Sequence, residues 1–410
     1  LKNNGWYGMM VRDSSHGNTL DGNIMISNND LGVSVSYSNN NLLMNNIVKK
    51  NMWGIQHEGA NSNIIRNNIA FNNSGAGIHI LGGSENTIEN NQISRNMWGI
   101  SSWIGGNHHI ANNTVWNNSQ YNFNLFMSDN NMIENNTADK GPTSVRVYNS
   151  AGNVLANNTM MNNDYGIYLY YASSTIIENN TFVGNDYGIG LSSASSNMIE
   201  NNVLEYNDIH AIEISSSSGN TLVGNEMIGN GIFIQGGSES YWTSQSIDTT
   251  NTVNGDPVYY WTDKVGGTVQ SDAGQVILAN TTDVTVEDLV LNDGSTAILL
   301  GFSDENNIES NIVENNVYGV YLYNSDQNIL TGNTFSYNED GAYLTGSADN
   351  LIYRNRFIDN YNQAYDDGDN DWDSGDPDTG GEGGNYWSDY TGTDRGDGIG
   401  DLPYSVTGDG

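Results

Sequence analysis

The chain has 410 residues, with 48 Asp and Glu against 12 Lys and Arg, so its formal net charge is −36. This acidic balance excludes nucleic acid as a partner, because no basic patch is available to meet phosphates. The chain has no cysteine, which excludes disulfides and iron–sulfur clusters. No apolar run approaches the roughly 18 residues of a membrane-spanning helix, so we expect no membrane insertion within this chain.

The dominant pattern is a repeat of about 22 residues, a period that indicates a solenoid. A motif of the type Asn-x-Ile-x-x-Asn carries the repeat. Its last asparagine falls at Asn23, Asn46, Asn68, Asn91, Asn113, Asn136, Asn158, Asn180, Asn202, Asn225, Asn311, Asn333 and Asn355. A glycine followed by alternating apolar residues keeps the same step, as in Gly77-Ile78-x-Ile80. Short period-2 segments between Asn, Gly and Ser turns predict strands. The expected fold is all-β, a right-handed parallel β-helix of about 17 coils with three short strands each.

The repeat also predicts how the chain is divided. We expect β-helix coils over residues 1–240. Residues 241–270 lack the pattern and are rich in Trp and Tyr, which predicts a distorted coil or loop insertion. Coils should resume over residues 271–365, and residues 366–410, rich in Gly and Asp, should form an acidic C-terminal cap.

The repeated asparagines are expected to be structural. In-register parallel stacking places each residue above its equivalent, so inward asparagines form a ladder whose amides hydrogen-bond along the stack. Asn113, Asn136, Asn158 and Asn180 should therefore lie in one column about one strand spacing apart.

The first residue, Leu1, aligns with Ile47 and so falls partway round a coil. A β-helix that begins there would present an open strand edge, which normally must be covered. Two explanations stay open. Upstream coils have been removed, or a second copy covers the edge end to end in a contact that propagates into a fibre.

The strand after the repeated glycine is the natural place for a site, because its second and fourth residues after the glycine should face solvent. Glu58 and His79 fall there on adjacent coils, about 8 Å apart. They are our candidates for catalysis around a sugar, against the alternative of a solvated surface pair. A strip of aromatic and basic side chains is predicted to bind glycan, or alternatively to stabilise the sheet by cross-strand stacking. Its members are Trp103, Arg146, Tyr148, Tyr168 and Tyr170.

Two further kinds of site follow from local motifs. Carboxylates in the glycine-rich turns near the C-terminus predict a Ca²⁺ site, because Ca²⁺ takes six to eight oxygens from flexible loops; the alternative is a plain acidic turn. These predicted metal ligands are Asp367, Asp369, Asp394, Asp397 and Asp401. Asn-x-Ser/Thr sequons predict glycosylation, although Asn-Asn-Thr also arises from the repeat itself. The sequon asparagines are Asn72, Asn112, Asn117, Asn135, Asn157, Asn179 and Asn280.

Blocks outside the repeat carry a family resemblance. They are Asn-Gly-Asp-Pro-Val-Tyr-Tyr at 254–260, Gln-Val-Ile-Leu-Ala-Asn at 275–280, Gly-Asn-Tyr-Trp-Ser-Asp-Tyr at 384–390 and Gly-Ile-Gly-Asp-Leu-Pro-Tyr at 398–404. With the repeat, they resemble the NosD-type, carbohydrate-binding-and-sugar-hydrolase β-helix family, as found in surface proteins of methanogenic archaea. The resemblance implies an extracellular or cell-surface protein associated with envelope glycan. The NosD name suggests copper, but soft-metal sites need clustered Cys, Met or His, and here Cys is absent.

Two classes of function follow. The first is a structural or adhesive surface module that binds polysaccharide or envelope glycan and assembles with itself. The second is a polysaccharide lyase or glycoside hydrolase that resembles the disaggregatase proteins of methanogens. The Gly-His-Gly setting of the polygalacturonase-type hydrolases does not occur in the sequence. The sequence therefore favours the surface module, with no assigned catalytic residue.

Overall fold

The structure, a computed structural model, describes residues 1–374, 383–393 and 402–408. It is an all-β parallel solenoid of about 16 turns, close to the roughly 17 coils expected from the repeat. The predicted fold class is confirmed.

The chain forms two compact units, which are described separately. Unit 1 contains Leu1–Asp208 and Ile212–Thr221, and unit 2 contains Ile209–Ala211 and Leu222–Gly410. Two strands carry residues of both units: β28 (His210–Ser215) and β29 (Thr221–Val223).

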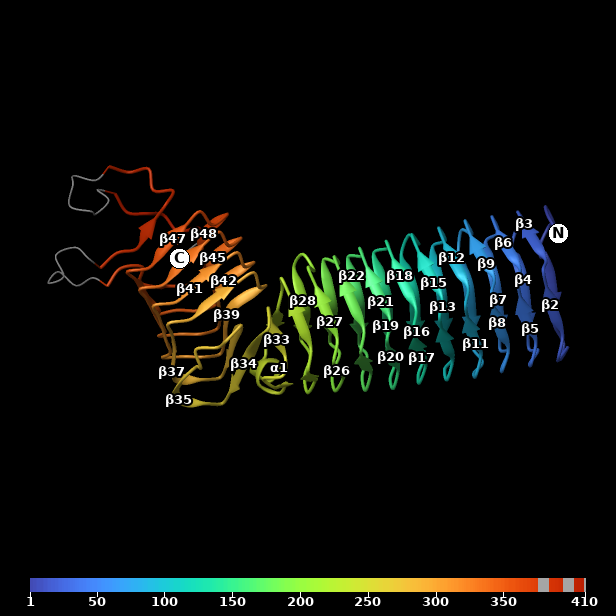
Figure 1. The fold of residues 1–410 in the computed structure, drawn as a ribbon, viewed down its shortest axis with the longest axis horizontal. Coiled ribbons are helices and arrows are strands. Elements are labelled where there is room, and N and C mark those ends of the chain that lie inside the picture. Colours follow the sequence, from blue (N-terminus) through green and yellow to red (C-terminus); the bar gives the residue numbers. More distant parts are fainter. Residues whose placement is uncertain (375–382, 394–401, 409–410) are drawn as a thin grey trace. The chain divides into compact units, whose positions relative to one another are not determined.

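In unit 1 each coil adds one strand to each of three parallel sheets, and the coils follow one another in chain order (Figure 1). The long-strand sheet contains β1 (Met9–Val11), β4 (Leu31–Ser36), β7 (Trp53–Glu58), β10 (Ala76–Leu81), β13 (Trp98–Trp103), β16 (Tyr121–Phe126), β19 (Thr143–Tyr148), β22 (Tyr165–Tyr170) and β25 (Tyr187–Ser192). The second sheet contains β2 (Thr19–Asp21), β5 (Leu42–Met44), β8 (Ile64–Arg66), β11 (Thr87–Glu89), β14 (His109–Ala111), β17 (Met132–Glu134), β20 (Val154–Ala156), β23 (Ile176–Glu178) and β26 (Met198–Glu200). The third sheet contains β3 (Ile24–Ile26), β6 (Ile47–Lys49), β9 (Ile69–Phe71), β12 (Gln92–Ser94), β15 (Thr114–Trp116), β18 (Thr137–Asp139), β21 (Thr159–Met161), β24 (Thr181–Val183) and β27 (Val203–Glu205).

The core of unit 1 consists of aliphatic columns. Ile78 pairs in parallel register with Ile55 on one side and Ile100 on the other. All three side chains are buried. Because the repeat places the same residue type one coil away, each inward side chain packs on its own equivalent, which keeps the strands from slipping in register.

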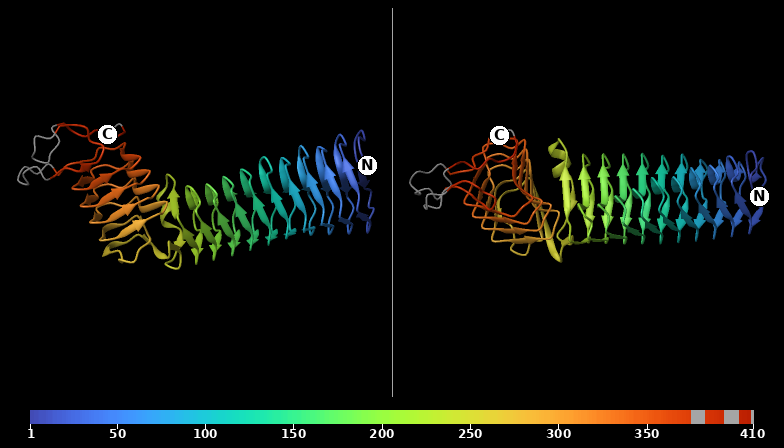
Figure 2. Two further views of the ribbon diagram at one scale, coloured as in Figure 1. Left: turned by 45° about the horizontal axis from the view of Figure 1, so that its top comes forward. Right: turned by 90° about the horizontal axis from the view of Figure 1, so that it is seen from above.

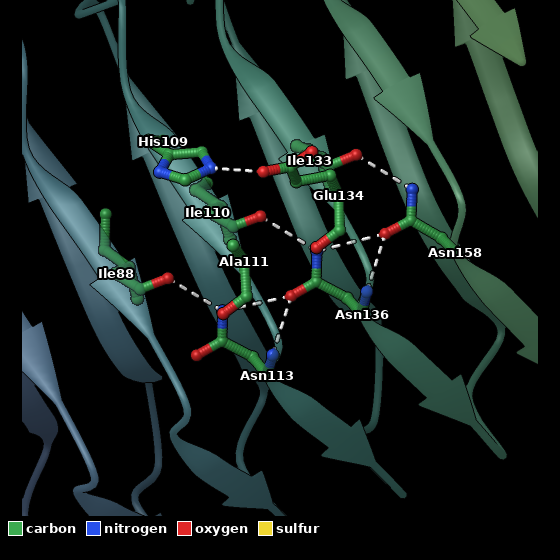
Figure 3. A network of polar contacts seen from close by, with 9 residues as sticks. All are labelled: Ile88, His109, Ile110, Ala111, Asn113, Ile133, Glu134, Asn136 and Asn158. Carbon is green, nitrogen blue, oxygen red and sulfur yellow. Dashed lines mark hydrogen bonds and ion pairs between the residues drawn. The ribbon is translucent and has the colours of Figure 1, made fainter.

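The asparagine ladder predicted from the repeat is present (Figure 3). The backbone N–H of Asn113 donates to Asn136 Oδ1 at 2.9 Å, that of Asn136 to Asn158 Oδ1 at 2.9 Å, and that of Asn158 to Asn180 Oδ1 at 2.9 Å. Each side-chain amide also donates to the next Oδ1 and to a carbonyl of the preceding coil, as Asn136 Nδ2 does to Ile110 O at 2.9 Å. The column predicted for Asn113, Asn136, Asn158 and Asn180 is confirmed.

Unit 1 contains two further ladders besides the one formed by the last asparagine of the motif. One runs through Asn41, Asn63 and Asn86 and reaches His108, whose Nδ1 accepts the backbone N–H of Asn86 at 3.3 Å. The other passes from Asn51 through Asn73. Buried backbone N–H groups at the corners of the coils are therefore satisfied by side chains of the next coil.

The repeated glycine interrupts the alternation of inward and outward side chains. A Cβ on Gly54 would lie 2.3 Å from the carbonyl oxygen of Gly77, and one on Gly77 would lie 2.5 Å from Ile93 Cγ2, so neither position has room for a side chain. The glycine and the residue after it both face the interior. As a consequence the residue before the glycine, such as Trp53 or Trp98, lies on the outer face.

Unit 2 continues with the same kind of coil. It begins with β30 (Glu226–Ile228), β31 (Ile232–Gln235), α1 (Glu239–Thr243), β32 (Ser246–Ile247), β33 (Thr252–Val253), β34 (Asp256–Thr262) and β35 (Val265–Thr268). Its regular coils contain β36 (Gln275–Ala279), β37 (Thr282–Glu287), β38 (Val290–Asn292), β39 (Thr296–Gly301), β40 (Asn307–Glu309), β41 (Ile312–Glu314), β42 (Tyr318–Tyr323), β43 (Ile329–Thr331), β44 (Thr334–Ser336), β45 (Asp340–Thr345), β46 (Leu351–Tyr353), β47 (Arg356–Ile358) and β48 (Asn362–Asp366), followed by β49 (Tyr386–Trp387). Both views in Figure 2 show these coils side by side in chain order.

The irregular range 241–270 contains most of α1 and the antiparallel pair β33 and β34. Trp242 of α1 is fully buried and lies against Gly301, where a Cβ would be 2.2 Å from its ring. It also stacks on Tyr323 at 5.6 Å. This segment therefore covers outer-face residues of unit 2 that the coils alone would leave exposed.

Aromatic residues close the last described coils of unit 2. Trp372 and Trp387 pack against the buried core, and Trp387 stacks on Phe357 at 4.5 Å and on Tyr404 at 4.0 Å. Asp366, which is also buried, accepts the indole N–H of Trp372 at 2.8 Å. Among the described residues, the C-terminal segment thus buries apolar surface in addition to carrying its acidic groups.

Candidate functional site

The outer side of the long-strand sheet in unit 1 carries a continuous set of aromatic rings, which we call the aromatic face. It spans β7, β10, β13, β16, β19, β22 and β25. Its members are Trp53, His79, Trp98, Trp103, Tyr121, Phe126, Tyr148, Tyr165, Tyr168, Tyr170 and Tyr187.

One column of the aromatic face lies at the last position of each strand. Trp103, Phe126, Tyr148 and Tyr170 are in direct register on consecutive strands. Their ring centroids are 5.3, 5.0 and 5.4 Å apart in that order, and the Phe126 and Tyr148 rings are nearly parallel. We call these four rings the terminal column; its spacing follows directly from the parallel strand spacing of about 4.8 Å.

A second set of rings lies before the glycines and joins the terminal column at one end. Trp53 stacks on His79 at 4.6 Å, and His79 meets the edge of Trp103 at 5.4 Å. Trp98 lies 5.2 Å from Trp103. Further along, Tyr165 and Tyr187 stack at 4.6 Å.

Polar side chains lie between these two sets of rings. Asn124 Nδ2 donates to Ser101 Oγ at 3.2 Å, and Arg146 Nη1 donates to Asn124 Oδ1 at 3.3 Å. Ser101 and Asn124 are buried although they face outward. The Arg146 guanidinium lies 4.6 Å from the ring centroid of Tyr148 and 5.0 Å from that of Tyr121, so cation–π contacts hold it in place.

The structure brings together the five residues predicted to bind glycan, since Trp103, Arg146, Tyr148, Tyr168 and Tyr170 all lie on the aromatic face. Whether they bind a ligand stays a prediction. The sequence analysis missed the rings before the glycines, Trp53, Trp98, Tyr165 and Tyr187. Strict alternation through the glycine would turn them inward, but their 22-residue recurrence immediately before the glycine is a signal that could have identified them.

The two candidate catalytic residues occupy different environments. His79 is only 3% exposed, its Nδ1 has no hydrogen-bond partner among the described residues, and burial lowers its pKa to about 4. Glu58 lies opposite Leu81 on the neighbouring strand and accepts a hydrogen bond from Ser36 Oγ at 3.3 Å. Among the described residues, no hydrogen bond or ion pair joins the side chains of Glu58 and His79. Neither therefore positions the other for proton transfer.

A histidine–carboxylate pair that the sequence analysis missed lies on the second sheet. His109 Nε2 and Glu134 Oε1 are 2.7 Å apart, and both side chains are partly exposed (Figure 3). The residues are separated by one coil and two positions, a diagonal neighbour spacing on one face of a sheet. The glycine motif marks only the long-strand sheet, so it gives no signal for a site on the second sheet.

Two histidines lie in the interior of unit 1. His57 is fully buried between Val35 and Ile80, and neither ring nitrogen has a partner among the described residues. Burial, with the nearby His108, lowers the His57 pKa to about 3, and burial lowers the His108 pKa to about 4. Both rings are therefore neutral at physiological pH.

All seven predicted glycosylation asparagines are exposed at left-handed corners, where φ lies between 53° and 56°. Four of them occupy the same corner of successive coils: Asn112, Asn135, Asn157 and Asn179. Glycans on neighbouring coils would be only about one strand spacing apart, so we expect occupied sites in this column to be separated by an empty one.

The predicted Ca²⁺ ligands are only partly described. Asp367 already accepts hydrogen bonds from Thr345 Oγ1 at 2.8 Å and from the backbone N–H of Gly346 at 2.7 Å, and Asp369 is exposed. Asp394, Asp397 and Asp401 lie outside the described residues. Calcium binding therefore stays a prediction.

If the C-terminal carboxylates bind Ca²⁺, removing the ion should leave them repelling one another. We expect EDTA to lower the Tm of calcium-loaded protein by several degrees, because a ligand bound only to the folded state stabilises it. Differential scanning calorimetry with and without EDTA measures this, and re-addition of Ca²⁺ is the control. A Tm that does not change would contradict the prediction.

With this geometry established, the comparison with protein families becomes informative. A family model described as periplasmic copper-binding protein (NosD) matches residues 1–124, 106–266 and 265–392. The chain belongs to the NosD family. This confirms the family that the sequence motifs indicated, whereas the likeness to archaeal surface proteins stays a prediction.

The copper named in the NosD description can be tested against the residues present. Over the ranges that the structure describes, no group of three His, Cys, Asp or Glu side chains lies close enough to hold a metal ion. Met160 is buried while its neighbour Met161 is on the outer side, so this pair does not converge. Neither the described His, Asp and Glu side chains nor the pair Met160 and Met161 fit a copper site.

A search of solved structures found several that are similar to this NosD-family chain. An alginate lyase from Paenibacillus sp. str. FPU-7 is 14% identical with a TM-score of 0.37, covering 62% of this chain and 92% of its own. The PL6 family alginate lyase AlyGC is 11% identical with a TM-score of 0.41, covering 94% and 80%. DFA-IIIase from Arthrobacter chlorophenolicus A6 in complex with GF2 is 10% identical with a TM-score of 0.38, covering 67% and 83%. Likeness at this level says nothing about ligand or activity.

Two other comparisons complete the description. Among curated proteins, none matches the chain significantly. Within the described residues, no helix has the length and apolar character needed to cross a membrane.

Proposed function

We propose that this NosD-family protein is an extracellular or cell-surface module with a structural or adhesive role, and that it binds polysaccharide along the aromatic face. The observation that carries the proposal is the continuity of that face. In the terminal column, rings follow one another at 5.0–5.4 Å over four coils, with Arg146 alongside.

Flat aromatic rings suit sugars for an electrostatic reason. The negative face of an aromatic ring attracts the weakly positive C–H groups on the face of a pyranose, and stacking removes apolar surface from water. One aromatic ring per coil recurs at about the length of one sugar unit in an extended chain. The terminal column therefore provides one aromatic contact per coil along the path of such a chain.

The corner after the terminal column adds exposed side chains next to its rings. Ile104, the residue after Trp103, has φ 53° and is 62% exposed. The equivalent corners of nearby coils hold Tyr37, Gly59, Gly82, Met127, Asn149 and Tyr171, all with left-handed φ, and Tyr37, Met127 and Tyr171 are exposed there as well. A β-branched residue there costs about 1–2 kcal/mol, and it leaves an apolar side chain exposed. The side chains of Ile104, Met127 and Tyr171 are therefore available beside the terminal column to contact a bound sugar chain.

The alternative function is that of a polysaccharide lyase or glycoside hydrolase, such as a disaggregatase-like enzyme. Such chemistry needs a general acid or base within hydrogen-bond reach of the scissile bond. The long strands β10 to β25 contain no Asp or Glu, and His79 is covered by Trp53 and Trp103. These observations favour binding without turnover.

The test compares two aromatic surfaces of the same protein. Phe126→Ala and Tyr148→Ala should each weaken polysaccharide binding about five- to tenfold in isothermal titration calorimetry, through loss of one stacking partner. The matched control is Tyr343→Ala, which interrupts the tyrosine stack of Tyr321, Tyr343 and Tyr365 in unit 2. The proposal would be contradicted if all three variants lost affinity for the polysaccharide equally, or if none of them lost affinity.

The same preparations separate binding from catalysis. We expect no release of reducing or unsaturated ends from any bound polysaccharide. Turnover by the wild-type protein that is abolished by Glu58→Gln or Arg146→Ala would establish the enzymatic alternative instead.

A further inference from the structure

The aromatic face differs in charge from the rest of the chain. The six strands β10, β13, β16, β19, β22 and β25 contain no Asp or Glu, although acids outnumber Lys and Arg by 48 to 12 in the whole chain. The next strand of this sheet, β7, ends in Glu58, and other sheets of unit 1 carry Glu134, Glu178 and Glu200. The acid-free stretch thus covers the aromatic face from β10 to β25, and only the strand of Trp53, β7, carries an acid.

The only Lys or Arg in these six strands is Arg146, and its environment favours binding of an anion. The guanidinium forms no ion pair with any residue that the structure describes. The Asn124 carboxamide and the rings of Tyr121 and Tyr148 hold it in place, and these contacts leave its charge uncompensated. Arginine presents several donors in a rigid fork that suits a carboxylate. Because Tyr148 belongs to the terminal column, the charge lies beside the path of a stacked sugar chain.

We infer that the ligand of the aromatic face is an extended acidic polysaccharide that runs across the coils, stacks on the terminal column and places a sugar carboxylate on Arg146. This inference rests on the proposed function and adds the ligand class. A neutral polysaccharide would not require strands without Asp and Glu. A uronate chain would be repelled by carboxylates on the strands that it crosses. The polysaccharide is expected to run across the coils because the rings of the terminal column repeat once per coil. This spacing matches the length of one sugar in a 1,4-linked chain with equatorial glycosidic bonds.

A matched pair of oligosaccharides tests the inference. Cellohexaose and its C6-oxidised form share one backbone and differ only in the carboxylates. We expect the oxidised hexamer to bind wild-type protein about tenfold more tightly or better, as for a charge-assisted hydrogen bond. Arg146→Gln should remove that difference, so that the two hexamers bind the variant with equal affinity. Arg146→Lys, which retains the charge, should keep part of the preference.

The outcomes separate the ligand class from the proposed function. If both hexamers bind wild-type protein equally, or if Arg146→Gln keeps the preference for the oxidised form, the inference fails while polysaccharide binding stands. If neither hexamer binds and other extended uronate oligosaccharides also fail, both are overturned. Circular dichroism of each variant shows that it remains folded.

Discussion

Asn136→Ala should destabilise unit 1 by about 3–5 kcal/mol, in the range for loss of a buried hydrogen-bond network. The Asn136 amide donates to Ile110 O, Glu134 O and Asn158 Oδ1, and its Oδ1 accepts from both the backbone and the side-chain N–H of Asn113. Alanine would leave these buried groups without partners, and each such group costs about 1–3 kcal/mol.

Urea unfolding of the full chain, together with hydrogen exchange of the amides in β14, β17 and β20, measures this loss. Exchange is included because each coil of a solenoid contacts only its neighbours, so damage is local. The control is Asn135→Gly at the adjacent exposed corner, where φ is 54° and glycine is tolerated. If Asn136→Ala were no more destabilising than this control, the asparagine ladder would not be what holds the coils together.

The second large effect is acid sensitivity of unit 1. His57, His79 and His108 have pKa values lowered by burial to about 3, about 4 and about 4. In the unfolded chain a histidine titrates near 6.5. Below that pH the unfolded state binds more protons than the folded state, so the stability is fully present above pH 6.5 and falls as the pH drops towards 4.

Between pH 6 and pH 5 each of the three histidines should cost about 1 kcal/mol, or roughly 3–4 kcal/mol together. Urea midpoints across this interval measure the loss. His57→Leu should reduce the slope by about a third, because its column neighbours Val35 and Ile80 are aliphatic and leucine suits the site. A His57→Leu slope equal to that of the wild type would show that His57 does not stay neutral in the fold.

The fold was predictable because every coil of a parallel solenoid needs the same residue types at equivalent positions, so the pattern recurs in the sequence. The motif around Asn136 gave the register of the regular coils and one ladder correctly. The ladder through Asn86, the first asparagine of the motif, is interrupted in the sequence at His108, whose imidazole nitrogen replaces the carboxamide oxygen as acceptor. A pattern search sees an interruption there, whereas the hydrogen bond is preserved.

The candidate site was predictable only in part. Trp103 and Tyr148 follow from alternation after the glycine, but Trp53 and Trp98 depend on a backbone position where two successive residues face inward. That departure follows from the packing of Gly77 against the neighbouring coil and has no local signature beyond the glycine. Trp242 was likewise recognisable as irregular, yet its burial on Gly301 depends on a contact between residues about three coils apart in sequence.

We propose that polysaccharide lies lengthwise across the coils, with one sugar for each ring of the terminal column. The direct measurement is the Kd of C6-oxidised cello-oligosaccharides of increasing length, from dimer to octamer. Affinity should rise with each added sugar until Trp103, Phe126, Tyr148 and Tyr170 are all covered, at about four or five units, and then level off. An affinity that is already maximal for the dimer would contradict the account, because it would show a single local site and no binding path along the solenoid.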